Sequence, residues 1–189
     1  QASGIMHFAY MTWFRQCYDY RHIQPYPTYY AMQRAMQPVL VSAELWGRNL
    51  YAGEKLHTRI YVVNDNEEGR DLKPMSLIWS IVDETDKVLA SGTEQFPAVE
   101  YYGRKYIEPN IHMPSNLPAD KVNAKLKLTL TENGVTLSKN EYGLLLARKE
   151  WNIGQVAENK KILLLDKDNM KATLDFLNIA CQTVPSIKE

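Results

Sequence analysis

The chain has 189 residues, enough for one full domain with additional pieces or for two small domains, and its 22 basic and 22 acidic side chains leave no formal net charge. A protein that binds nucleic acid normally carries a basic excess or a concentrated basic face, so this balance argues against nucleic acid as a partner. No window reaches the roughly 18 apolar residues that a bilayer requires, so we expect no membrane span.

Residues 1–38 are expected to form a strand, a loop and a helix. Residues 4–10 (GIMHFAY) are apolar and aromatic without clean alternation, which is typical of a short strand covered on both faces. After an aromatic-rich stretch, Pro27 opens the segment PTYYAMQRAM, because proline is tolerated in the first turn of a helix, and Pro38 marks its end. A single β/α unit of this kind does not close a sheet by itself.

From Val39 onward the sequence changes to runs with period two, which predict strands with one buried and one solvated face. The clearest is 124–130, where three leucines alternate with two lysines and a threonine. Asn133-Gly134 is a strong signal for a two-residue hairpin. The pattern predicts a mainly β fold, an immunoglobulin-like antiparallel β-sandwich flanked by short β/α segments. The predicted strands lie within residues 39–46, 56–64, 76–84, 87–96, 105–113, 124–132 and 141–151.

Past Trp151 the pattern changes again. Residues 160–165 (KKILLL) form an apolar run that predicts a strand, and Asp168 is placed to cap a following helix. One face of that helix is expected to carry Met170, Leu174, Leu177 and Cys181. We expect this second β/α unit to be the start of a further domain or a linker, because one strand and one helix bury too little surface.

The sequence predicts no metal site and no cofactor. The histidines at 7, 22, 57 and 112 include no i, i+4 pair, and Cys17 and Cys181 stand at no metal-ligand or disulfide-framework spacing. The acidic turn of Asp65, Glu67, Glu68 and Asp71 lacks the ligand order of a helix-loop-helix calcium site, so we expect a solvated turn. No glycine-rich phosphate loop and no serine nucleophile elbow is present.

No catalytic residue is assigned either. Cleavage of a glycosidic bond by the retaining mechanism requires two carboxyl groups about 5 Å apart across the sugar. Most acidic residues fall instead in turns or on wet faces and are expected to be solvated, among them Glu44, Glu54, Asp83, Glu84, Glu132 and Glu141.

Aromatic residues outside the predicted core are candidate sugar contacts, because sugars stack their C–H faces on exposed rings. Trp13 lies in the densest aromatic run and is either a sugar contact or packing that joins the first segment to the sandwich. Tyr101 and Tyr102 lie in a predicted loop between strands and are the best candidates on the sandwich itself.

The segment from residue 2 to 42 resembles the last strand and helix of the catalytic barrel in glycoside hydrolase family 2, passing into the next sandwich. The order of several short motifs carries the resemblance. They are Ser3-Gly4-Ile5-Met6, Trp13, Asp19-Tyr20, Pro25-Tyr26, Tyr29-Tyr30-Ala31 and Pro38-Val39, followed by Gly53 and Asn64-Asp65 in the sandwich opening and by Asn140, Tyr142 and Trp151 in its closing strand. Residues 8–12 (FAYMT) depart from the Trp-Gln-x-Asn-Asp run of many relatives, which puts sugar contacts from that strand in doubt.

The resemblance implies a piece of a β-galactosidase- or β-mannosidase-like enzyme. Residues 1–38 would be the remnant of the last β/α unit of the barrel, 39–152 the sandwich, and 153–189 the start of a further β/α domain or a linker. The family's two catalytic glutamates come from earlier barrel strands, so this chain alone would be non-catalytic and would brace the barrel of the same parent chain. Many such enzymes are exported by bacteria, which implies a periplasmic or secreted location.

Two other functions remain open at this point. The sandwich and its aromatic residues would also suit a carbohydrate-binding module. An immunoglobulin-like domain that binds another protein is the third possibility, since the fold alone implies no function.

Overall fold

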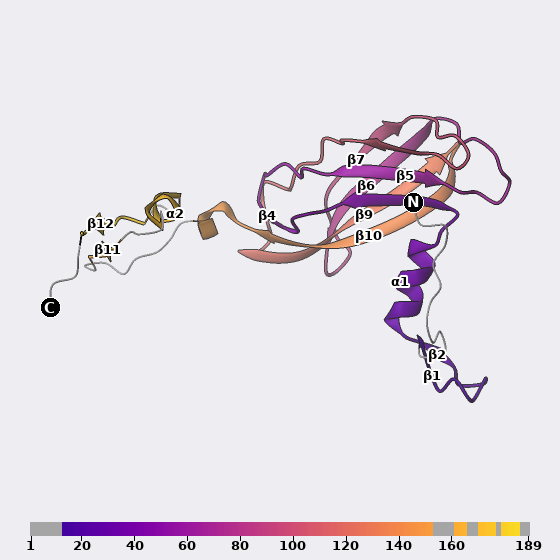
Figure 1. Cartoon of the computed structure of the whole chain (residues 1–189), viewed down its shortest axis with the longest axis horizontal. Coiled ribbons are helices and arrows are strands. Elements are labelled where there is room, and N and C mark those ends of the chain that lie inside the picture. Colours follow the sequence, from indigo (N-terminus) through magenta and orange to yellow (C-terminus); the bar gives the residue numbers. More distant parts are fainter. Residues whose placement is uncertain (1–12, 153–160, 166–169, 177–178, 186–189) are drawn as a thin grey trace.

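The computed structural model describes residues 13–152, 161–165, 170–176 and 179–185, and its centre is a β-sandwich (Figure 1). One sheet has five strands in the order β4-β10-β9-β6-β7. These strands are β4 (Asn49–Tyr51), β6 (Met75–Asp83), β7 (Val88–Phe96), β9 (Lys121–Glu132) and β10 (Val135–Ala147). The other sheet has three strands in the order β3-β5-β8. They are β3 (Val39–Glu44), β5 (Arg59–Asn64) and β8 (Arg104–Ile107).

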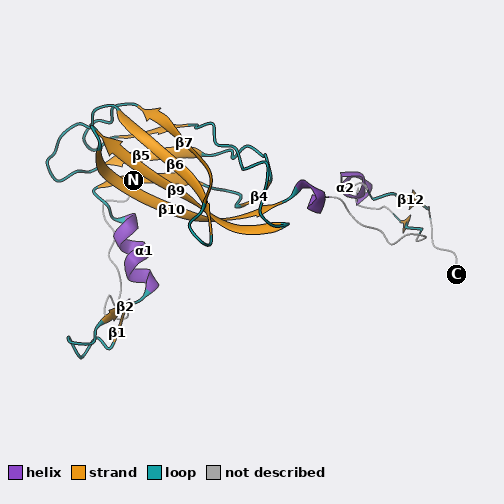
Figure 2. Ribbon diagram, turned by 180° about the vertical axis from the view of Figure 1, so that it is seen from behind, coloured by secondary structure: helices purple, strands orange, loops and turns teal. Residues whose placement is uncertain are grey.

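The two sheets lie face to face, and their inward-pointing side chains make one core (Figure 2). In β9 every second residue from Val122 to Glu132 is buried, as the alternation of leucine with lysine and threonine predicts. The largest side chains that are almost fully buried are Phe96, Ile60, Leu72, Met75, Leu77, Ile81, Ile111, Leu126, Leu128, Leu130, Leu146 and Val41. The predicted mainly β sandwich is therefore confirmed.

All seven predicted strands are present, but their details differ. The strand predicted at 141–151 is β10, which runs from Val135 to Ala147 and is followed by a 3-10 helix over Lys149–Asn152. The short strand β4 was not predicted. The pairing of β10 with the short strand β4 is parallel, whereas the other pairs of the sandwich are antiparallel. Strand β8 covers only the first part of the predicted run 105–113. The run contains Pro109, which has no N–H to donate to a neighbouring strand, so the ladder does not continue through it.

The turn between β9 and β10 is the predicted two-residue hairpin. Glu132 pairs with Val135, and the two residues between them have positive φ, 50° at Asn133 and 81° at Gly134. Positive φ at both central positions is the requirement of a type I′ turn, which asparagine and glycine meet with little strain. The hairpin sets the register of the two longest strands.

The segment before the sandwich contains a small hairpin and one helix, which extend away from one end of the sandwich (Figure 1). The hairpin pairs β1 (Phe14–Arg15) with β2 (Gln24–Pro25), and the helix α1 (Pro27–Ala35) begins at the predicted proline. The Phe14 ring lies 5.2 Å from that of Tyr29 on α1. The strand predicted at residues 4–10 lies outside the described residues.

Beyond the opposite end of the sandwich, β11 (Leu163–Leu164) pairs in parallel with β12 (Gln182–Thr183), and α2 (Met170–Phe176) lies between them in the chain (Figure 1). The predicted strand and helix are present. The prediction that Cys181 shares the helix face is wrong, because α2 ends before it and the chain enters β12. Asp168 and Leu177 lie outside the described residues. No helix among the described residues has the length and apolar character to cross a bilayer.

Candidate functional site

Side chains of β10 cover the edge of β3 that faces away from β5. An edge strand leaves backbone N–H and C=O groups without a ladder partner. Here the N–H of Val41 donates to Ser138 Oγ at 3.0 Å, and the N–H of Ala43 donates to Tyr142 Oη at 2.9 Å. Asn140 Nδ2 donates to the Val41 carbonyl at 2.9 Å and to Tyr142 Oη at 3.0 Å. These alternate residues of β10 replace a neighbouring strand and join the two sheets along what we name the β3–β10 seam.

Gln37 attaches the end of α1 to this seam. Its Nε2 donates to the carbonyls of Arg34 and Lys139, at 2.6 and 3.0 Å. Its Oε1 accepts from Ser138 Oγ at 3.0 Å and from the Lys139 N–H at 3.2 Å. Because one amide bonds both the last turn of the helix and the backbone of β10, the direction in which α1 leaves the sandwich is held by side-chain hydrogen bonds.

The turn after β5 is held by two asparagines. Asn64 is fully buried, and its Nδ2 donates to the carbonyls of Arg70 and Val99 at 3.0 and 3.2 Å. Asn66 Nδ2 donates to Asn64 Oδ1 at 2.6 Å, and Asn66 Oδ1 accepts from the Arg70 N–H at 3.2 Å. Asn64 therefore has a structural role, because its buried amide joins β5 to the turn that follows it and to Val99.

Glu132 is buried, so the prediction that it is solvated is wrong. It occupies the last inward-facing position of β9, where the strand alternation carries it to the core side after Leu130. Arg70 bonds both carboxylate oxygens, at 2.8 and 3.2 Å, and the Lys73 N–H donates to Oε1 at 2.7 Å. The hydrogen bonds from Arg70 outweigh desolvation and lower the pKa of Glu132 below its usual 4.5.

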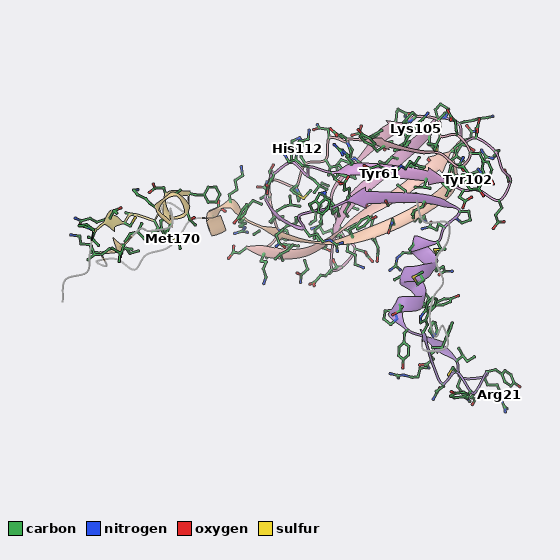
Figure 3. The ribbon with its side chains drawn as sticks, viewed as in Figure 1. Arg21, Tyr61, Tyr102, Lys105, His112 and Met170 are labelled. Atoms are coloured by element: carbon green, nitrogen blue, oxygen red, sulfur yellow. The ribbon has the colours of Figure 1, made fainter. Side chains whose placement is uncertain are left out.

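Tyr101 and Tyr102 lie, as predicted, in the loop between β7 and β8, at the end of the sandwich from which α1 leaves (Figure 3). The Tyr102 side chain is 74% exposed and Tyr101 is half as exposed, at 37%. Their ring centres are 4.5 Å apart with the planes inclined at 61°. Asp71 Oδ1 accepts the Tyr101 N–H at 2.9 Å, which holds the loop. The two rings form an edge contact and do not make a flat stacking platform.

Trp13 lies beside α1 and away from the Tyr101–Tyr102 loop. It is partly buried and directly precedes β1. It lines a hollow of 280 Å³ whose other walls are Tyr29, Met32, Gln33 and Met36. Neither loop tyrosine lines this hollow, so the structure brings two of the three candidate sugar contacts together and keeps the third on the helical segment.

The described residues include no group of three or more His, Cys, Asp and Glu side chains that could hold a metal ion. The side chains of the acidic turn are exposed, as predicted for a solvated turn, and Glu68 pairs with Arg70 at 2.8 Å. Cys17 and Cys181 are free thiols.

Sequence reasoning did not identify Gln37, Ser138 or Arg70. Ser138 had a usable signal, because it is a polar residue at an inward-facing position of a strand, and such a residue needs a hydrogen-bond partner. Gln37 and Arg70 had none, since their partners are 102 and 62 residues away in the sequence.

No protein family and no curated protein matches this sequence. Similar solved structures include a β-glucuronidase from glycoside hydrolase family 2, with 14% identity and a TM-score of 0.42 over 57% of this chain and 11% of that chain. The exo-β-D-glucosaminidase CsxA has 16% identity and a TM-score of 0.45 over 64% and 12% of the two chains. A putative β-galactosidase from Bacteroides fragilis has 10% identity and a TM-score of 0.40 over 58% and 16%. This chain thus spans less than a fifth of each of them.

Proposed function

We propose that this chain is a non-catalytic accessory β-sandwich region of a glycoside hydrolase family 2 enzyme, which hydrolyses O-glycosidic bonds in carbohydrates. Its role is to brace the catalytic barrel. In this proposal residues 1–38 end the barrel, 39–152 form the sandwich, and 153–189 begin a further β/α domain or a linker.

The observation that supports a brace is the β3–β10 seam together with Gln37. Asn140 and Tyr142, two residues that carry the resemblance to the family, both donate or accept hydrogen bonds in this seam. Gln37 bonds the same strand and the last turn of α1, immediately before the Pro38-Val39 exit of the family pattern. A brace requires this kind of connection, because a flexible joint would transmit no restraint to the barrel.

The exposed aromatic side chains before the sandwich support the same proposal. Tyr18 and Tyr20 are 97% and 80% exposed, and no residue of α1 is buried. Monomeric proteins rarely expose large contiguous apolar patches unless another surface covers them. In the proposal that covering surface is the rest of the barrel.

The reading frame around the coding region tests the proposal most directly. We expect an in-frame region upstream of Gln1 that encodes the preceding β/α units of a barrel, with two glutamates whose carboxyl groups can face each other across a sugar. A reading frame that begins immediately before Gln1, or an upstream domain of another architecture, would overturn the proposal.

Turnover assays of the isolated chain give the matching biochemical test. The purified chain is incubated with aryl β-galactoside, β-mannoside and β-glucuronide substrates, and release of the aryl group is followed by absorbance. We expect no turnover, because the catalytic pair lies in the preceding barrel strands. Turnover that disappears on substitution of a carboxylate within residues 1–189 would contradict a non-catalytic role.

The alternative of a carbohydrate-binding module at the Tyr101–Tyr102 loop has less support. A binding platform of two aromatic rings requires nearly coplanar faces, whereas these planes are inclined at 61°. A third function, as a protein-interaction domain, would require a large apolar patch on the sandwich.

A further inference from the structure

A second hollow, of 370 Å³, lies at the other end of the three-stranded sheet from α1. It lies where β3 ends, β5 begins and the chain leaves β8. At a rise of roughly 3.3 Å per residue, the length of β3 places it about 17 Å from the junction with α1. Lys55 in its wall forms an isolated antiparallel β-bridge with His112. Figure 3 shows His112 and Tyr102 at opposite ends of the sandwich. The residues around it are Glu44, Trp46, Lys55, Leu56, His57, Thr58, Arg59, Glu108 and Pro109.

Trp46 presents an exposed and oriented ring at this hollow. It is 90% exposed, although tryptophan is among the residues that gain most from burial. Its Nε1 donates to Glu44 Oε1 at 3.0 Å, so one edge of the indole is held while its face stays open. The other oxygen of Glu44 accepts from the hydroxyl of Tyr61, at 3.3 Å. A ring held at its edge is prepared to stack on the C–H face of a ligand.

Polar groups held in place lie beside that ring. Arg59 lies opposite Glu44 in the register of β5 with β3, and on its other side Arg59 Nε donates to Glu108 Oε1 at 3.1 Å. The Arg59 guanidinium lies over the Tyr106 ring, 5.1 Å from its centre. Glu108 uses one of the five N–H groups of Arg59, Tyr61 is a second hydrogen-bond partner of Arg59, and Glu108 is 66% exposed, so donors and an acceptor remain available to a ligand.

The charges of the hollow balance. Two cationic side chains, Lys55 and Arg59, face two carboxylates, Glu44 and Glu108. An anionic ligand would meet both carboxylates, and a cationic ligand would meet both basic groups, so neither gains from the site as a whole. A neutral ligand with several hydroxyl groups matches donors and acceptors of both kinds.

We propose that this hollow binds a neutral saccharide of one or two rings. The sugar stacks its C–H face on Trp46, and its hydroxyls bond the free N–H groups of Arg59 and the free oxygen of Glu108. The volume is at the lower end for small-molecule sites, which suits a short end or segment of a glycan. The site goes beyond the bracing role, because it would hold carbohydrate without cleaving it and at the end of the sheet away from α1.

Titration of the chain with neutral oligosaccharides tests the proposal. The probes are the tetrasaccharides of β-linked glucose, mannose, galactose and xylose, added to millimolar concentration and followed by calorimetry and by tryptophan fluorescence. We expect saturable binding of at least one of them with a Kd of about 1 mM or below. Trp46→Ala is expected to weaken it at least about tenfold through loss of the stacking face, and Glu108→Gln to weaken it less.

Tyr102→Ala is the matched control, since it removes an exposed aromatic ring at the opposite end of the sheet, and it should leave the affinity unchanged. Trp46→Phe keeps an aromatic face and should retain most of the binding, which separates stacking from a change in fold. No saturable binding in the panel overturns the proposal, as does binding that Tyr102→Ala abolishes and Trp46→Ala leaves intact. The titration measures binding, whereas the accessory role is tested by turnover. Absence of binding would therefore overturn the saccharide site alone, and detection of turnover would count against the accessory role.

Discussion

At the scale of single residues, Trp79 and Gly92 show how one core contact restricts the sequence. They are directly opposite each other on β6 and β7, and Trp79 is buried. A Cβ at position 92 would lie 2.6 Å from the Trp79 ring, closer than side-chain carbons approach in folded proteins. The indole is held by the core, so it has little freedom to move aside.

We therefore predict that Gly92→Ala lowers the free energy of unfolding by about 1–3 kcal/mol, the usual cost of overpacking a core. Urea denaturation measures this change. Gly143→Ala is the control, because nothing lies within 4 Å of the Cβ it would add. Equal stability of the two variants would show that Trp79 can move and would contradict this account of the contact.

Glu132 supplies the second prediction at this scale. Its pKa is lowered, chiefly by Arg70, so the carboxylate contributes stability above its unfolded pKa near 4.5 that is lost as pH falls through the lower folded value. Arg70→Met leaves the buried carboxylate with fewer donors and should cost roughly 1–3 kcal/mol at neutral pH.

The pH dependence separates the ion pair from simple loss of packing. The melting temperature of the unsubstituted chain should fall more steeply below pH 4.5 than that of Arg70→Met, because the substituted chain has less of this contribution to lose. Arg59→Met is the control, since it also removes an arginine from a carboxylate pair, but the Glu108 partner is 66% exposed. Parallel pH profiles for all three chains would argue against the assigned role of Glu132.

At the scale of elements, the β3–β10 seam explains how an edge strand avoids a row of open backbone groups. The hydroxyl of Tyr142 accepts hydrogen bonds from both Ala43 and Asn140, and burial raises its pKa above the usual 10.0. It therefore stays neutral across the physiological range, and the seam does not titrate there.

Tyr142→Phe should leave the Ala43 N–H without its partner and cost about 1–3 kcal/mol. We expect faster amide hydrogen exchange at Ala43, with the exchange rates of β6 and β9 little changed. Glu141→Gln, at the exposed neighbouring position of β10, should stay within about 0.5 kcal/mol of the unsubstituted chain. Unchanged exchange at Ala43 in Tyr142→Phe would mean that the hydroxyl does not protect the seam.

At the scale of the whole molecule, the two ends of the three-stranded sheet differ in chemistry. The end beside α1 carries Gln37 and the Tyr101–Tyr102 loop, and it leads into a segment rich in exposed tyrosine, while the seam runs along β3 between the two ends. The opposite end carries the Trp46 hollow, with balanced charges and an oriented ring. The proposed attachment to a barrel and the proposed ligand site thus lie at different ends of the sheet, which lets the two proposals be tested independently.

Features encoded within a few residues were determined by the sequence itself. Alternation in 124–130 predicted the strand and its buried face, Asn133-Gly134 predicted the hairpin, and Pro27 predicted the start of the helix, because each depends on local backbone geometry and the period of apolar residues. The burial of Glu132, the seam partners of Val41 and the hollow around Trp46 were decided only by the tertiary structure. Each depends on partners far along the chain that strand pairing or sheet packing brings close. A local sequence pattern does not specify which distant side chain will form a hydrogen bond with a buried polar group.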